Sequence, residues 1–207
     1  MLHQNLNFMI KLTQTLFLLL LMQLGVQAQQ RYTLNNKKSK ILWKVETIGK
    51  HHGDILFSSG RLDYSSIGQP TTGYFIIDMK NMRSNDRPTP QGRAQIDAQL
   101  RSPDFFDVAH YASATMDVKQ ITSTSNPLIF KVKGNLTIKG ISNPVEFNAS
   151  INKKADVISV KANLSINRTK WNIDHKPDPK PLDLFGVIKD KMMTDDILIT
   201  LDLLFAK

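Results

Sequence analysis

Four histidines that follow the N-terminal leader are the residues best suited to metal or acid–base chemistry, and they are His51, His52, His110 and His175. Adjacent residues on a β-strand point to opposite faces, so His51 and His52 could share a metal ion only from a tight turn. Gly49 and Gly53 bracket the pair and favour such a turn. However, no third ligand stands at metal-site spacing and the chain has no cysteine. We therefore expect polar turn residues here and no metal site.

Motifs for other chemistry are missing as well. The chain has no G-x-S-x-G elbow, no H-E-x-x-H and no glycine-rich phosphate loop. Asp195 and Asp196 are expected merely to precede the last strand. The sequence predicts no catalytic residue, no enzyme and no covalent cofactor. A metal-dependent enzyme built on His51, His52 and His175 is the least favoured alternative.

The first residues read as a secretory signal. A polar start leads into the short apolar run "LTQTLFLLLLMQL", and Val26 and Ala28 occupy the small-residue positions of a signal-peptidase site. Gln14 and Gln23 interrupt the run, which is too short for a transmembrane anchor. We predict that residues 1–28 are a cleaved signal peptide and that the mature protein is periplasmic or secreted. Without a cysteine it cannot be a lipoprotein.

Charge and cysteine content restrict the partners. The formal net charge is +9 and there are no cysteines, so an exported form must be stabilised by a core rather than by disulfides. The lysines are scattered, and we expect no nucleic acid as a partner. The positive charge serves solubility or faces an anionic membrane surface. The oligomeric state stays open, a dimer included.

Most of the remaining chain alternates apolar and polar residues with a period of two. This pattern is typical of antiparallel strands that are wet on one side. The eight predicted strands are 40–47, 54–64, 73–79, 112–121, 128–138, 143–153, 157–167 and 196–205. The alternation slips by one residue across Ser58–Gly60, which predicts a β-bulge.

One segment departs from the strand pattern. Residues 92–101 have helical spacing, and Ser102 followed by Pro103 predicts a further turn over 103–107. We expect one domain over residues 31–207, mainly β: an eight-stranded antiparallel barrel with a short helical insertion. Such a barrel is either filled by side chains or holds one small ligand.

The inward face of the predicted strands is apolar. Its candidate residues are Trp43, Val45, Phe57, Phe130, Val132, Leu136, Phe147, Ile151, Val160, Leu164 and Ile166. Gly134 is expected to leave space among them. The pattern alone does not decide between a solid core and a cavity.

Several motifs occur together in a characteristic order. They are "LRSPDFFDVAHYASATM", then "VKGNLTIKGISNPVEFNASI", then "LSINRTKWNI". In this order they resemble the YceI-like family of exported, polyisoprenoid-binding proteins, over roughly residues 31–207. Two segments, 80–92 and 171–191, depart from the family pattern that we expect.

The resemblance implies a lipocalin-like barrel with a long apolar pocket. We then expect a non-catalytic binding protein that holds a polyisoprenoid, an isoprenoid quinone or a fatty acid or amide. Its apolar tail would lie among the inward residues given above. Its head group would lie at a mouth near His51, His52, Phe105 and Phe106. The alternative is a solid barrel that acts as a membrane-surface or protein interaction module.

Overall fold

A computed structural model describes residues 29–45, 51–173 and 194–207. The predicted signal peptide, Gly49, His175 and most of the 171–191 segment lie outside these residues. The described elements are β1 (Gln30–Leu34), β2 (Lys40–Val45), β3 (His51–Tyr64), β4 (Pro70–Ser84), α2 (Pro90–Arg101), β5 (Ser113–Ser123), β6 (Ile129–Ile138), β7 (Ile141–Lys154), β8 (Val157–Asn167), the 3-10 helix η1 (Arg168–Trp171) and β9 (Asp196–Ala206).

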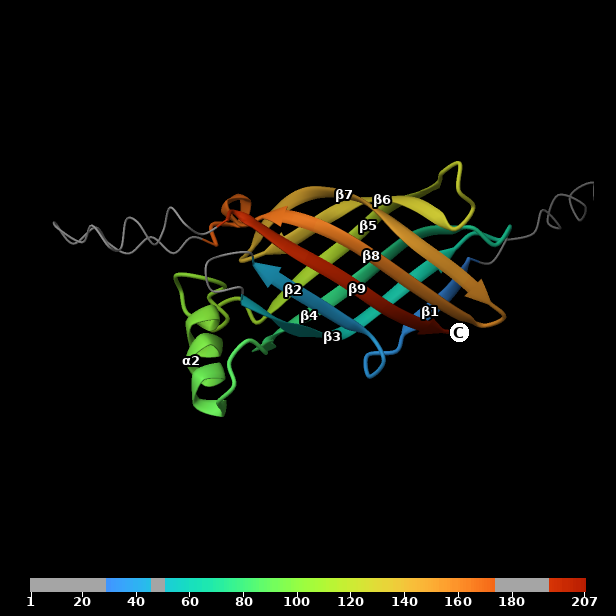
Figure 1. Ribbon diagram of the computed structural model, residues 1–207. Coiled ribbons are helices and arrows are strands. Elements are labelled where there is room, and N and C mark those ends of the chain that lie inside the picture. Colours follow the sequence, from blue (N-terminus) through green and yellow to red (C-terminus); the bar gives the residue numbers. More distant parts are fainter. Residues whose placement is uncertain (1–28, 46–50, 174–193) are drawn as a thin grey trace, which may run out of the picture.

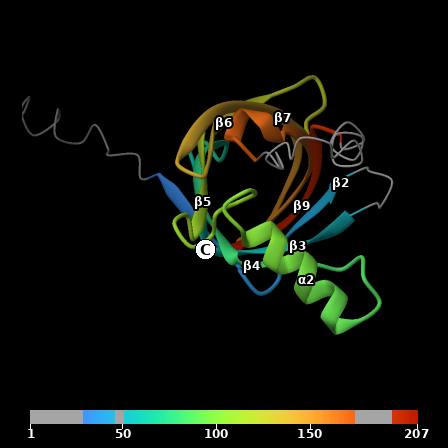
Figure 2. The same ribbon diagram turned by 90° about the vertical axis from the view of Figure 1, so that its left-hand side faces the viewer.

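The strands form one closed antiparallel barrel (Figures 1 and 2). From β3 to β9, each strand pairs with the strand that follows it in the chain. This includes β4 and β5, although helix α2 lies between them in the sequence. The short strands β1 and β2 both pair with β3 and β9, so they occupy the same position in the barrel. The predicted eight-stranded barrel is therefore confirmed, with one position divided between two strands.

Strand β6 shows why these sequences form a barrel wall. Its inward residues Phe130, Val132 and Leu136 are buried. On the outer face, Lys131 Nζ and Lys133 Nζ lie 3.0 and 3.1 Å from the carboxylate oxygens of Glu146 on β7. These ion pairs are exposed and stabilise the sheet little, so burial of the inner face supplies most of the driving force.

Strand β3 contains the predicted irregularity. Its register against β4 shifts between Phe57 and Ser59, which confirms the bulge. At Gly60, an added Cβ atom would lie 2.7 Å from the Phe75 ring and 2.9 Å from the Leu34 side chain. Glycine is required there because β1 and β4 side chains approach the bent strand closely.

Helix α2 lies at one end of the barrel (Figure 2). It begins two residues before the predicted helix, and the side chain of its N-cap, Thr89, accepts a hydrogen bond from Gly92 N. The predicted turn over 103–107 is also present: Phe105 N donates to Ser102 O at 3.1 Å, and Asp107 has a φ of 45°.

No helix in the described part of the chain has the length and apolar character needed to cross a membrane.

Candidate ligand cavity

An apolar cavity of about 110 Å³ lies inside the barrel. Its lining comes from the inward faces of β2 to β9 and contains no polar or charged residue. The lining residues are Ile41, Phe57, Leu62, Phe75, Ile77, Met116, Val118, Ile121, Val132, Leu136, Val145, Phe147, Ala149, Ile151, Val160, Leu164, Ile199, Leu201, Leu203 and Phe205. An apolar void of this kind excludes water and favours apolar ligands.

Packed aromatic residues close the barrel end that holds β1. The rings of Tyr32 and Tyr64 are buried with their centroids 5.2 Å apart, and Phe205 is buried in the same cluster. The Lys153 ammonium lies 5.1 Å from the Tyr32 ring centroid and 5.0 Å from that of Tyr64. Burial, and next the neighbouring Tyr32, raise the pKa of the Tyr64 phenol to about 12.

A second apolar cluster packs at the α2 end. Trp171 is 1% exposed, and its indole Nε1 donates to Leu136 O at 3.1 Å. Arg168 is buried beside it: Nη1 donates to Ile173 O at 2.9 Å, and Nη2 lies 3.1 Å from Asp195 Oδ1. These contacts anchor η1 across this end of the barrel.

The structure places the eleven predicted inward residues in three groups. The residues that line the cavity are Phe57, Val132, Leu136, Phe147, Ile151, Val160 and Leu164. Phe130 packs in the Tyr32 cluster, whereas Trp43, Ile166 and the partly buried Val45 pack in the α2-end cluster. Their ligand-binding role stays a prediction.

The predicted inward set contains no residue of β4, β5 or β9, although all three strands contribute to the lining. In β9, Ile199, Leu201, Leu203 and Phe205 face the cavity at every second position. Thr200 and Asp202 point outward and mark the correct phase. The alternation that identifies the inward residues is therefore present in the sequence of β9. It is hard to recognise because two outward residues, Leu198 and Leu204, are apolar as well.

The expectation for Gly134 was wrong. A Cβ atom at this position would lie 2.4 Å from Asp117 O and 2.8 Å from Met116 Cε. The space is thus occupied by β5, which approaches closely next to its register shift between Val118 and Gln120.

The predicted turn at His51 and His52 was also wrong. Both residues belong to β3, paired with Val45 and Lys44. The ring Nδ1 of His51 contacts the carboxylate of Asp86, whose side chain is 4% exposed, and His52 is exposed. The side chains of His51 and His52 point to opposite faces of the sheet because successive residues of a strand alternate between the two faces.

Asp86 is the charged centre of this contact. Burial opposes its ionisation, but hydrogen bonds from Ser84 and His51 and the charge of His51 outweigh burial and lower the pKa of the carboxyl group. Within the described ranges, no three His, Cys, Asp or Glu side chains gather as metal ligands.

The two predicted mouth phenylalanines lie near α2. Phe105 is buried in the α2-end cluster, and Phe106 packs against it partly buried. Both rings therefore contribute to the packing that closes this end of the barrel, and a contact with a ligand head group stays a prediction.

Comparisons with known proteins agree with this architecture. A UPF0312 protein of Vibrio cholerae is 30% identical over 115 residues, which are 51% of this chain and 60% of that protein. The chain thus matches about 60% of the length of this curated relative.

Two solved structures share the fold. BcnA of Burkholderia cenocepacia has a TM-score of 0.64 at 18% identity, with 83% of this chain and 98% of that one covered. A polyisoprenoid binding domain from Saccharophagus degradans has a TM-score of 0.59 at 14% identity, with 84% and 97% covered.

The family model agrees with the resemblance read from the sequence. The model of the YceI-like domain matches residues 32–205, which include every described strand from β2 to β8 and most of β1 and β9. The chain belongs to the YceI-like family.

Proposed function

We propose that this protein is an exported carrier that holds a long-chain amphiphile in the barrel without changing it covalently. The candidate ligands are a polyisoprenoid, an isoprenoid quinone and a fatty acid or amide. The observation that carries the proposal is the cavity, because all of its lining residues are apolar. Membership of the YceI-like family and the named ligand class of the Saccharophagus degradans domain support it.

The energetics favour a flexible apolar tail. Each methylene moved from water into the cavity contributes about 0.8 kcal/mol. A tail of several such groups offsets the ordering and association costs without a strong polar anchor. Selectivity then follows the length and width of the cavity.

The size of the void determines how a long tail could enter. At about 110 Å³ it is somewhat smaller than the engineered cavity of ~150 Å³ that binds benzene. A longer tail must therefore displace lining side chains. Phe147, Leu164 and Met116 are the candidates to move, because they are only partly buried and pack against the edges of the two core clusters.

We place the head group at the α2 end. Two buried donors there, Trp43 Nε1 and Arg101 Nε, have no hydrogen-bond partner among the described residues. A carbonyl, hydroxyl or carboxylate of an amphiphile could accept from such donors. This orientation puts the tail among the lining residues towards Phe205.

The small void also favours a second function, a packed barrel that acts as an interaction module. Introducing a charged side chain into the cavity distinguishes the carrier from the interaction module. We expect Leu164→Arg and Phe147→Arg to lose bound lipid, because an unpaired guanidinium destabilises an apolar tail beside it. Ser165→Arg is the matched control, since Ser165 is exposed on the same strand. Folded Leu164→Arg and Phe147→Arg variants that retain extractable lipid at the level of the control would contradict the internal site.

A further inference from the structure

Three hairpins lie together at the barrel end opposite α2 (Figure 1). They connect β3 to β4, β5 to β6 and β7 to β8, and we call residues 65–69, 124–128 and 153–157 the hairpin rim. Each tip carries one exposed large apolar side chain: Ile67 is 81% exposed, Leu128 51% and Val157 44%. Water-exposed aliphatic groups on three neighbouring tips indicate an interaction surface.

Local hydrogen bonds hold the tips in place. In the first tip, Ser65 N donates to Gln69 O at 2.8 Å, and Gly68 N donates to Ser65 O at 3.0 Å. The positive φ of Gly68, 78°, completes that turn. In the second, Leu128 N donates to the Asn126 side chain at 3.0 Å. The apolar groups are therefore presented by ordered turns, and little conformational entropy is lost when they contact a partner.

The charge around the rim is mainly positive. Lys153 and Lys154 are exposed on the β7 side of the third hairpin, and Lys207 N donates to Asp156 O at 3.2 Å, which keeps Lys207 beside this hairpin. Asp156 is the exposed acid of the rim. Cations next to protruding apolar tips are the combination that anionic lipid surfaces attract.

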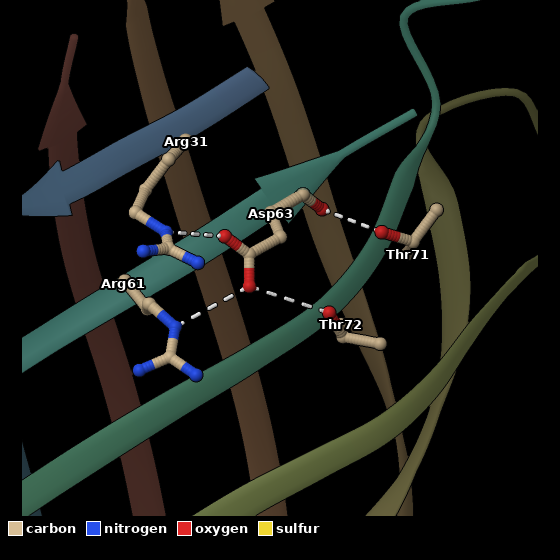
Figure 3. Close-up of polar contacts among 5 residues, drawn as sticks. All are labelled: Arg31, Arg61, Asp63, Thr71 and Thr72. Atoms are coloured by element: carbon tan, nitrogen blue, oxygen red, sulfur yellow. Dashed lines mark hydrogen bonds and ion pairs between the residues drawn. The ribbon is translucent and has the colours of Figure 1, made fainter. Parts of the chain in front are cut away.

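A buried carboxylate near this end, that of Asp63, is compensated by cations. Asp63, with its side chain 6% exposed, accepts from Arg31 Nε at 2.9 Å and from Arg61 Nε at 3.4 Å, as Figure 3 shows. Thr72 Oγ1 lies 3.4 Å from the same carboxylate. Two guanidinium groups thus face one carboxylate, and the cluster adds to the positive charge near the rim.

The α2 end has a different character. Among the described residues, its segments mix carboxylates and cations in similar numbers: Asp54, Asp86, Asp97, Asp104, Asp107, Asp195 and Asp196 lie with Lys80, Arg83, Arg87, Arg93, Arg101, Lys139, Arg168 and Lys170. The hairpin rim differs from this end in its three exposed aliphatic side chains, Ile67, Leu128 and Val157.

We propose that the hairpin rim docks on an anionic lipid bilayer. Ile67, Leu128 and Val157 enter the interfacial region, and Lys154, Lys207 and the Arg31–Arg61 pair face lipid phosphates. This docking rests on the outer surface and holds whether or not the cavity carries a ligand.

Vesicle flotation tests the rim. The full mature chain is mixed with vesicles of phosphatidylcholine alone or with one third phosphatidylglycerol, at low and at high NaCl. We expect binding to the anionic vesicles that weakens with salt. The triple variant Ile67→Ser, Leu128→Ser, Val157→Ser should bind at least tenfold more weakly. Its control is Leu42→Ser with Leu198→Ser, because these exposed apolar residues lie on the side of the barrel.

The contribution of charge is tested with Lys154→Glu, and Lys80→Glu is its control, because Lys80 is an exposed lysine in the half of β4 nearer to α2. Removal of one interfacial cation weakens binding about fivefold, and reversal weakens it further. Equal binding to both vesicle types, or equal losses in the rim variants and their controls at unchanged thermal stability, would overturn the docking surface. Native mass spectrometry of the same samples keeps the ligand separate: lost vesicle binding with retained ligand supports the rim and leaves the carrier proposal intact.

Discussion

Filling the cavity with a larger side chain should abolish ligand binding while the protein still folds. Ala149 is 2% exposed and lines the void on β7, and Val160 lines it on the neighbouring strand β8. A larger side chain at either position occupies space that a ligand tail would use. We therefore predict that Ala149→Phe and Val160→Phe fold and lose bound lipid.

The magnitude follows from the volume of the void. At ~24 cal/mol per Å³, an empty space of about 110 Å³ corresponds to about 2.6 kcal/mol of stability that filling could recover. Strain from an imperfect fit costs about 1–3 kcal/mol. The two effects nearly cancel, so we expect the free energy of unfolding of the ligand-free protein to change by no more than about 1.5 kcal/mol.

Urea unfolding of delipidated protein measures the stability, and native mass spectrometry measures the ligand. Asn148→Phe is the matched control, because Asn148 is the exposed neighbour of Ala149 on the outer face. A destabilisation well beyond 3 kcal/mol in both filled variants would mean that no usable void exists. Filled variants that bind lipid as strongly as Asn148→Phe would refute the internal site.

Three further predictions concern the ends of the barrel. Burial raises the pKa of Tyr64 to about 12 from its ordinary 10, so the free energy of unfolding falls by up to about 3 kcal/mol as the pH rises through this range. A titration followed by tyrosinate absorbance should show one phenol that ionises at higher pH than the others, and Tyr64→Phe should abolish it. The lowered pKa of Asp86 contributes stability above the ordinary carboxyl pKa that is lost as the pH falls through the lowered value. Asp86→Asn should therefore flatten the decline of Tm below about pH 4, and an unchanged acid profile would contradict this. Trp171→Phe should cost about 1–3 kcal/mol in urea unfolding, because the buried Leu136 carbonyl loses its indole donor; a smaller loss would mean that water replaces the donor.

The inward and outward residues of the barrel wall could be predicted because one face of each long strand is exposed to solvent. After the first residue of β6 and of β8, outward polar residues alternate with the inward ones, so the inward set follows from the pattern. The short β1 was missed. Its five residues contain only two buried side chains, Tyr32 and Leu34, too few to establish a period.

The ends of the barrel were harder to predict than its wall. Trp43 and Ile166 point inward as expected, yet they belong to the α2-end cluster, which also contains Trp171 of η1 and Phe105 and Val108. Position along the barrel axis depends on register and on the closing segments, and a period-two pattern contains neither. For the same reason His51 looked like a turn residue, although its partner is Asp86, thirty-five residues away.

Bound ligand in the purified protein tests the carrier most directly. The full chain, including the predicted signal peptide, is expressed in a bacterial host, purified, and examined by native mass spectrometry before and after extraction with organic solvent. We predict an added mass that solvent removes and that corresponds to an isoprenoid or acyl chain. A bare polypeptide mass, unchanged after incubation with such lipids, would contradict the carrier and leave a packed barrel.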